Sequence, residues 1–342
     1  MRVVRILLIV LAALAAAAVG FVVWLRHPSQ EFQKEAFVNL ERGSGTRDIA
    51  ATLEQSGVIR HSWEFLLARM LRPSTTLQAG EYRFDQPANV FDVFGRIARG
   101  DVYHFEFTVP EGSNTFDIAR LLADQGILKE NDFLKAAGNT AMIADLAPKA
   151  KSLEGYLFPS TYRMTHSTTA TDLCRMMTQE FRKHWKQLSQ GPREVHSVVT
   201  LASLVEKETG SAAERPLVAS VFENRLSMGM KLECDPTTIY AALLDHHYNG
   251  VIHRSDLDSK NPYNTYQHEG LPPGPIANPG AGALEAALHP AETKYLFFVA
   301  KAEGGGHHFS LTLAQHEQAV REYRAGAKHE NVAAKDAART SH

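Results

Sequence analysis

The sequence predicts an α+β protein with a single transmembrane helix at its N-terminus. Three observations support this prediction: an uncharged apolar stretch at 6–25, a strand–helix–helix–strand pattern that occurs twice between 37 and 164, and amphipathic helices with short strands from 165 to 324. Hydrophobic residues make up 44% of the 342 residues and charged residues 22%, so the chain can bury a core. The remaining predicted segments are a short tail at 1–5, a polar tether at 26–36 and a polar, disordered tail at 325–342.

The apolar stretch at 6–25 is long enough to cross a membrane. At about 1.5 Å per residue it covers about 30 Å, the thickness of the hydrocarbon layer. A cleaved signal peptide is the alternative, because the run Ala15–Ala18 offers small residues for a cleavage site. The apolar run continues past these alanines to Leu25, which favours an uncleaved anchor. Basic residues lie on both sides, and we place the short tail in the cytoplasm because a large body after one anchor is most simply the translocated part.

A pattern of residues that starts at Val38 recurs from Val109. Gly, Ser, Thr, Asp, Ile, Ala and Leu residues match at one offset, which chance rarely produces. Each copy predicts a strand, a Gly-Ser turn and a capped helix, followed by a second helix and a returning strand. Small carbohydrate-binding modules have this plan, but a spacer or a protein-docking surface would have the same pattern. The second helices are expected at 62–71 and 130–137, and the returning strands at 80–84 and 156–163.

The segment Val195–Thr209 predicts an amphipathic helix that carries two glutamates near its end. On a regular helix Glu206 falls near the centre of the apolar stripe, whereas Glu208 points to the far side. A carboxyl group aimed into an apolar face loses hydration, which raises its pKa and suits a general acid for glycosidic cleavage. The alternative is a buried glutamate that pairs with a nearby arginine, such as Arg215 or Arg225.

Polar side chains around the following helices and one long loop are candidates for substrate binding. The segment 214–228 predicts a helix with polar groups beside its apolar stripe, and Asp235 before Pro236 predicts the start of the next helix, where Asp235 is an N-cap or a binding residue. The loop 261–280 is rich in proline, and its Tyr, Asn and Thr side chains suit sugar rings, hydroxyls and acetamides. The candidate substrate-binding residues are Asn224, Arg225, Asp235, Tyr240, Tyr263, Asn264, Thr265, Tyr266 and Asn278.

Composition and missing motifs exclude several other functions. Lys and Arg number 36 against 38 Asp and Glu, which is too balanced for a protein whose main partner is a nucleic acid. The 16 histidines have no spacing typical of metal ligands, and no serine-hydrolase, P-loop or dinucleotide motif is present, so no metal or cofactor is expected. The two cysteines, Cys174 and Cys234, either form one disulfide bridge or remain free.

Several motifs in this order closely resemble the YceG-like endolytic murein transglycosylases, the MltG family. The resemblance covers the chain from the apolar stretch to about residue 320. The matching motifs are LEGYLFPSTY at 153–162, EKET at 206–209, NRL at 224–226, DPT at 235–237, PYNTY at 262–266, GLPPGPI at 270–276 and NPG at 278–280.

This resemblance implies a single-pass protein of the inner membrane, with LysM-like modules before a mixed α/β catalytic domain in the periplasm. It implies a lyase that cleaves the β-1,4 bond between N-acetylmuramic acid and N-acetylglucosamine in nascent glycan strands, leaves 1,6-anhydro ends and terminates strand elongation. The first glutamate of the family's EKET motif, taken as the catalytic one, maps onto Glu206. The implied partners are peptidoglycan strands, the membrane, and penicillin-binding proteins or other wall-synthesis components.

A lone carboxyl group suits this reaction. A hydrolase normally needs two carboxyl groups beside the scissile bond. In the lyase reaction the C6 hydroxyl of the sugar attacks C1, so one glutamate can protonate the leaving oxygen and then accept the C6 proton. Two alternatives remain: a muramidase that uses water, and a non-catalytic glycan-binding scaffold of the wall-synthesis machinery.

Overall fold

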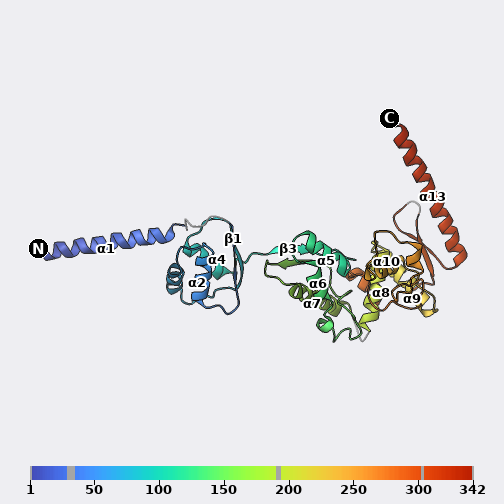
Figure 1. Cartoon of the computed structure of the whole chain (residues 1–342), viewed down its shortest axis with the longest axis horizontal. Coiled ribbons are helices and arrows are strands. Elements are labelled where there is room, and N and C mark those ends of the chain that lie inside the picture. Colours follow the sequence, from blue (N-terminus) through green and yellow to red (C-terminus); the bar gives the residue numbers. More distant parts are fainter. Residues whose placement is uncertain (1, 29–34, 190–193, 302–303, 341–342) are drawn as a thin grey trace. The chain divides into compact units, whose positions relative to one another are not determined.

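The computed structural model describes residues 2–28, 35–189, 194–301 and 304–340 (Figure 1). The chain divides into two compact units. The first comprises 1–106 with 163–168, and the second comprises 107–162 with 169–342. The described residues form a mixed α+β structure that is mostly helical and has small two-stranded sheets, in agreement with the predicted fold class.

The first unit contains one copy of the predicted strand–helix–helix–strand pattern. Strands β1 and β2 pair antiparallel, with Val38 opposite Tyr82, and buried side chains such as Phe65, Phe94 and Ile97 fill the core beside them. The second helix and the returning strand have the predicted bounds. Helix α4 follows the returning strand. In chain order the elements are α1 (Arg2–Arg26), β1 (Ala36–Leu40), α2 (Thr46–Gln55), α3 (Ser62–Leu71), β2 (Gly80–Phe84) and α4 (Val90–Arg99).

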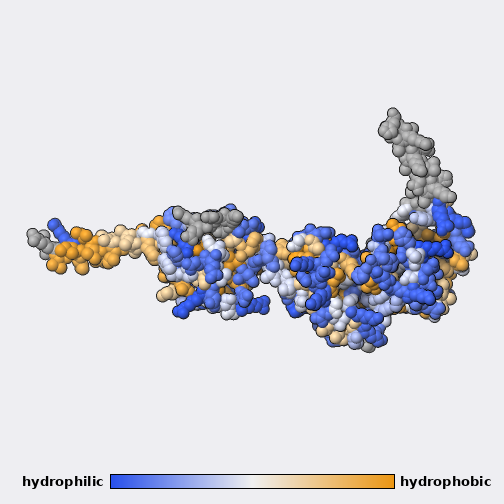
Figure 2. Space-filling model, viewed as in Figure 1, coloured by the Kyte–Doolittle hydropathy of each residue, from blue (hydrophilic) through white to orange (hydrophobic). Residues whose placement is uncertain are grey.

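Helix α1 has the length and composition of a membrane span. Its segment Val3–Arg26 contains an 18-residue window with a mean hydropathy of 3.0 and no buried residue, and Leu25 near the end of the helix is buried. Figure 2 shows it as a rod of hydrophobic residues. A single exposed apolar helix of this kind fits either an anchor or a signal sequence.

The second unit holds the second copy of the pattern and the helices that follow it. Strands β3 and β4 pair in a two-stranded sheet, and the division between the units falls within both strands. The elements are β3 (Phe105–Thr108), α5 (Thr115–Asp124), α6 (Glu130–Ala137), the 3-10 helix η1 (Thr140–Met142), β4 (Thr161–Met164), α7 (Ala170–Leu188), α8 (Val195–Glu208), α9 (Arg215–Ser227), α10 (Asp235–Leu244), α11 (Arg254–Leu257), α12 (Ala281–Leu288), β5 (Phe297–Ala300), β6 (His307–Ser310) and α13 (Leu313–Thr340).

The returning strand of the second copy is shorter than the sequence predicts. It starts at Thr161 rather than at Tyr156. The amides of Gly155 and Leu157 donate to the side-chain oxygen of Asn278 and not to a neighbouring strand. The apolar residues at 156–158 are therefore a buried loop, which a strand pattern in the sequence does not distinguish from a strand.

The C-terminal helix α13 begins with a capping box. The backbone N–H of Gln315 donates to Thr312 Oγ1 over 3.3 Å, and the Gln315 side chain accepts from the amide of Thr312 over 3.4 Å. The helix runs to Thr340, across most of the segment 325–342 for which the sequence predicts disorder. This segment is rich in alanine, and alanine has the highest helix propensity. The domain boundaries expected at 36, 164 and 324 stay predictions.

The two cysteines are free and buried. Burial raises the pKa of the Cys174 thiol to about 12, so this thiol stays protonated at neutral pH. Of the two alternatives, one disulfide bridge or two free thiols, the structure has two free thiols.

Replacing Gly155 by alanine should destabilise the protein far more than the same change at Gly126. Both glycines have positive φ, +86° and +67° respectively. A Cβ at Gly155 would lie 2.4 Å from Pro275 and 2.8 Å from Val199, whereas nothing lies within 4 Å of one at Gly126. We expect Gly155→Ala to lower the free energy of unfolding by about 3 kcal/mol or more, and Gly126→Ala by about 1 kcal/mol.

Urea unfolding of the detergent-solubilised full chain, followed by circular dichroism, measures both values. Equal losses would mean that the backbone around Gly155 relaxes to accept the methyl group.

Candidate active site

Helix α8 lies at the centre of the second unit. It packs against α9, α10 and α12, and every residue from Val199 to Val205 is buried. Its N-terminus is capped by Glu194, whose carboxylate accepts the amide of Ser197 over 3.0 Å. A helix buried on all sides has no single apolar stripe. The side to which Glu208 points therefore faces other parts of the protein, and not open solvent as the helical wheel implied.

The Glu206 carboxylate lies in a closed cluster of charges. One oxygen accepts the amide of Gly280, at the start of α12, over 3.0 Å, and the other lies 3.4 Å from the Arg215 guanidinium. Arg215 is also 3.4 Å from Glu111, and only 6% of the Glu206 side chain is exposed. Burial raises the pKa of Glu206, whereas the Gly280 amide and Arg215 act against this rise. The predicted alternative, a buried glutamate paired with Arg215, is therefore present in the structure.

Glu208 lines a pocket of about 560 Å³. The thiol of Cys234 donates to Oε1 of Glu208 over 3.0 Å. Burial raises the pKa of Glu208, and the nearby charge of Asp235 raises it further. The surroundings of Glu208 differ from those of Glu206. Among the described residues, no arginine or lysine forms an ion pair with Glu208. The pocket is lined by Glu208, Phe222, Arg225, Leu232, Glu233, Cys234, Asp235, Tyr266, Phe298, Val299, His316, Val320 and Arg324.

Three of the predicted binding residues meet in this pocket. The hydroxyl of Tyr266 donates to the Asp235 carboxylate over 2.6 Å. Only 7% of Arg225 is exposed. Its guanidinium group donates to the carbonyls of Leu296 over 2.7 Å and Leu232 over 2.9 Å. Arg225 thus forms a fixed part of the pocket wall, and the Tyr266–Asp235 pair forms another.

Asp235 is not the N-cap of α10. The helix starts at Asp235 itself, with Cys234 as the extended N-cap residue and no side-chain cap hydrogen bond. The Asp235 carboxylate instead accepts from Tyr266, which draws it away from the helix end. The predicted start was one residue too late, because Pro236 fits either of the first two helical positions.

Most of the other predicted binding residues hold the backbone in place. Asn264 is fully buried and donates to three backbone carbonyls between 256 and 259. Thr265 accepts the amide of Cys234 over 3.0 Å. Asn224 donates to two carbonyls of the segment before β5. These polar groups satisfy buried backbone, so they fix the loops around the pocket and do not present side chains to a ligand.

Asn278 joins three segments of the second unit. Its side-chain oxygen accepts the amides of Gly155 over 2.8 Å and Leu157 over 2.9 Å. Its side-chain nitrogen donates to the carbonyl of Ser113 and to the Glu154 carboxylate, each over 2.9 Å. Asn278 is fully buried, so its role in the structure is to lock these segments together.

Glu154 is the buried acid of this network. Its carboxylate accepts the amide of Thr115 over 2.9 Å and the hydroxyl of Tyr240 over 3.0 Å, in addition to Asn278. The ring of Tyr263 lies 5.1 Å from that of Tyr240. The Tyr240 hydroxyl is therefore bound to Glu154, and neither Tyr240 nor Tyr263 lines the pocket of Glu208. Burial raises the pKa of Glu154 from 4.5 to about 7.

Glu154 should make folding stability depend on pH. Its pKa is about 7 in the folded protein and 4.5 as its ordinary value, so the folded state holds a proton that the unfolded state loses in this range. This contribution to stability is complete below pH 4.5 and is lost as the pH rises to about 7, by about 3 kcal/mol in all. Glu154→Gln should remove this part of the pH dependence, whatever its effect on absolute stability.

The measurement is urea unfolding of wild type and variant at a series of pH values from 4 to about 8. An identical slope in both proteins would assign the pH dependence to other groups.

Two functional candidates escape the sequence analysis. Glu208 was set aside because of its helix face, and His316 was considered only as a metal ligand. His316 Nδ1 is buried and has no hydrogen-bond partner among the described residues, and its side chain lines the pocket. A signal for Glu208 is present in the sequence, because it lies in the same EKET motif as Glu206.

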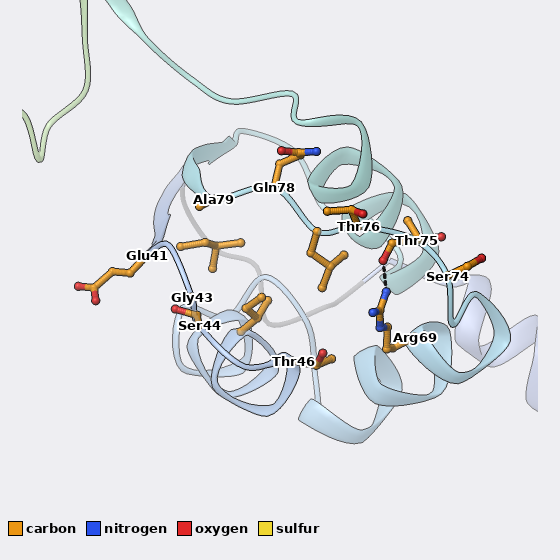
Figure 3. Close-up of a pocket in the computed structure, with 13 residues that line it drawn as sticks. Glu41, Gly43, Ser44, Thr46, Arg69, Ser74, Thr75, Thr76, Gln78 and Ala79 are labelled. Carbon is orange, nitrogen blue, oxygen red and sulfur yellow. Dashed lines mark hydrogen bonds between the residues drawn. The ribbon is translucent and has the colours of Figure 1, made fainter.

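A second pocket, of about 310 Å³, lies in the first unit (Figure 3). It is lined by the turn after β1, with Ser44 and Thr46, and by the segment between α3 and β2, with Thr75 and Gln78. Arg69 donates to the carbonyl of Thr75 and holds that segment. Hydroxyl and amide groups thus dominate the labelled side chains in this pocket, and they suit neutral polar ligands.

Comparison with known proteins matches most of the chain to one family. The model of the YceG-like family matches residues 38–322. An endolytic murein transglycosylase of Bacillus subtilis strain 168 is 33% identical over 306 residues, which cover 84% of this chain and 84% of that protein. A protein of the same name in Streptococcus pneumoniae strain D39 is 28% identical over 325 residues. This match covers 85% of the chain but only 59% of the pneumococcal protein.

A solved structure is similar as well. The crystal structure of a YceG-like protein of Listeria monocytogenes has 31% sequence identity and a TM-score of 0.54. The match covers 83% of this chain and 99% of that one.

Proposed function

Because this chain belongs to the YceG-like family, we propose that it is an endolytic lytic transglycosylase of peptidoglycan. The observation that carries the proposal is the similarity over most of the chain to proteins named endolytic murein transglycosylases. The bond cleaved is the β-1,4 bond between N-acetylmuramic acid and N-acetylglucosamine in nascent strands. The products carry 1,6-anhydro ends, and cleavage terminates strand elongation.

A single buried glutamate on α8 can carry out the chemistry of this reaction. A protonated carboxyl group donates its proton to the glycosidic oxygen as the bond to C1 breaks. The C6 hydroxyl of the same sugar then forms the new bond to C1, and the carboxylate takes up the hydroxyl proton. One carboxyl group thus returns to its starting state without a water molecule or a second carboxylate.

We assign this role to Glu206, as the sequence predicts. Burial raises its pKa, and the neighbouring charge of Glu111 raises it further, which favours the protonated form that a general acid needs. The Gly280 amide and Arg215 stabilise the carboxylate that remains after the proton is donated. Glu208 is the alternative, because its pKa is raised as well and it lines the pocket with Asp235 and Tyr266.

Two further parts of the proposal concern location and binding. The α1 helix would remain uncleaved and anchor the protein in the inner membrane, with both units on the periplasmic side. The strand–helix–helix–strand units would be LysM-like modules, and the pocket of the first unit would hold a glycan through its hydroxyl and amide groups.

Product analysis tests the proposed reaction. The full-length protein, solubilised in detergent, is incubated with uncrosslinked glycan strands, and the fragments are identified by mass spectrometry. We expect 1,6-anhydro ends. Fragments with reducing ends would instead indicate a muramidase, and the absence of fragments from folded protein would support the non-catalytic scaffold.

A further inference from the structure

Helix α3 carries apolar side chains on two opposite sides. Phe65 and Ala68 are buried in the core of the first unit. On the other side, Trp63, Met70 and Leu71 are 42%, 76% and 63% exposed. Leu66 and Leu67 are partly buried and pack against the edge of the core, and with the three exposed residues they have the i, i+3, i+4, i+7, i+8 spacing of an apolar helix stripe. Apolar side chains that face water do not stabilise a folded unit, so this outward stripe suggests an apolar neighbour.

The N-terminal end of α3 contacts the last turns of α1. The ring of Trp63 stacks on Trp24 at 5.6 Å and on Phe21 at 5.9 Å. Arg60, just before α3, donates to the carbonyls of Trp24 over 3.1 Å and His27 over 2.7 Å, so it caps the C-terminal end of α1. The Arg60 guanidinium also lies 4.4 Å from the Trp24 ring.

The C-terminal end of α3 lies beside the same turns of α1. Leu71 and the adjacent Arg72 line a cavity of about 710 Å³ together with Val22 and Arg26. Leu71 follows Trp63 by eight positions, about 12 Å along α3. The α1 residues beside the two ends of α3 all lie between Phe21 and Arg26, a stretch of about 7.5 Å along the α1 axis. Helix α3 therefore runs across α1 and not along it.

This crossing fixes the depth of α3 relative to a membrane. If α1 crosses the bilayer, its last turns lie where the hydrocarbon meets the headgroups, a layer about 5–7 Å thick. Helix α3 then lies flat in that layer, parallel to the membrane plane. Tryptophan and arginine are the side chains typical of this layer, and Trp63, Arg72 and Arg26 lie there.

We propose that the outward face of α3 is inserted among the phospholipids of the leaflet at the C-terminal end of α1. This inference rests on the anchor in the proposed function and adds a second membrane contact to it. The apolar stripe of Trp63, Met70 and Leu71 contacts acyl chains, and the guanidinium groups of Arg26 and Arg72 face lipid phosphates. The first unit is thereby held against the membrane surface.

A depth measurement tests this inference. The full-length protein carrying Met70→Cys with a nitroxide label is reconstituted into liposomes of phosphatidylethanolamine and phosphatidylglycerol. The matched control carries the label at Arg47→Cys, an exposed position on α2. The two native cysteines are buried, and wild type treated with the same label gives the background. We expect the label at 70 to collide several-fold more often with oxygen, relative to a water-soluble nickel chelate, than the label at 47.

Two outcomes would overturn the inference, and they differ in what else they affect. If the protein floats with the liposomes and both labels are equally accessible to the nickel chelate, α3 does not contact lipid, although α1 is an anchor. If the protein does not float with the liposomes, the anchor itself fails, and the membrane contact of α3 fails with it.

Discussion

Glu206→Gln is expected to lower the rate at which anhydro-ended fragments form by at least about 100-fold, since general acid and base catalysis contributes roughly 10²–10⁴. The amide keeps the size of the carboxyl group, and its oxygen can still accept the Gly280 amide, but it cannot supply or take up a proton. Arg215 retains Glu111 as its partner, so the site should remain intact. Rates come from mass spectrometry of fragments released by the full-length variant at saturating glycan.

Glu208→Gln is the matched control, because it makes the same change two residues later on the same helix. The amide oxygen can still accept from the Cys234 thiol. We expect a loss of less than about 10-fold, from displaced neighbours rather than from lost proton transfer. The reverse result, with the large loss at Glu208 and the small one at Glu206, would move the role of general acid to Glu208. Circular dichroism confirms that both variants are folded.

Asn278→Ala is expected to lower the free energy of unfolding by about 4 kcal/mol or more, because unsatisfied buried groups cost about 1–3 kcal/mol each. The substitution leaves the amides of Gly155 and Leu157 without their partner, whereas the carbonyl of Ser113 keeps the backbone amide of residue 278. It also removes a donor from the Glu154 carboxylate. Urea unfolding of the detergent-solubilised chain measures the loss.

The control for this prediction is Asn224→Ala, because the Asn224 side chain bonds to backbone carbonyls alone among the described residues. Asn224 makes two hydrogen bonds and is half-buried, so water can replace part of what it provides. We expect a loss of about 1–2 kcal/mol. A similar loss in both variants would show that the Asn278 network contributes no more than an ordinary pair of hydrogen bonds.

Local features of the sequence predict most of the helices correctly. Periodicity and capping residues give α3 and α6 the bounds that the structure has, and α8 and α9 to within one residue at each end. The apolar stretch predicts α1, and the repeat predicts the plan of the first unit. These features depend on neighbours three or four residues apart, which the sequence displays directly.

The candidate site depends on contacts that the sequence does not display. Asn278 is correctly selected as special, but its partners are 121 to 165 residues away along the chain, so its role as a lock and not as a sugar ligand emerges only from the fold. Asn264 and Tyr240 are similar cases. A polar residue in a long loop indicates that something must bond to it, and does not reveal whether that partner is backbone or substrate.

The choice between two glutamates shows the same limit most sharply. The sequence by itself determined that a helix ending in EKET carries the acid candidates, because composition and spacing are local. A helical wheel gives the angle between Glu206 and Glu208 but not what lies on either side. Only the tertiary structure placed Arg215 and Gly280 beside one and an open pocket beside the other, since α8 is enclosed by α9, α10 and α12.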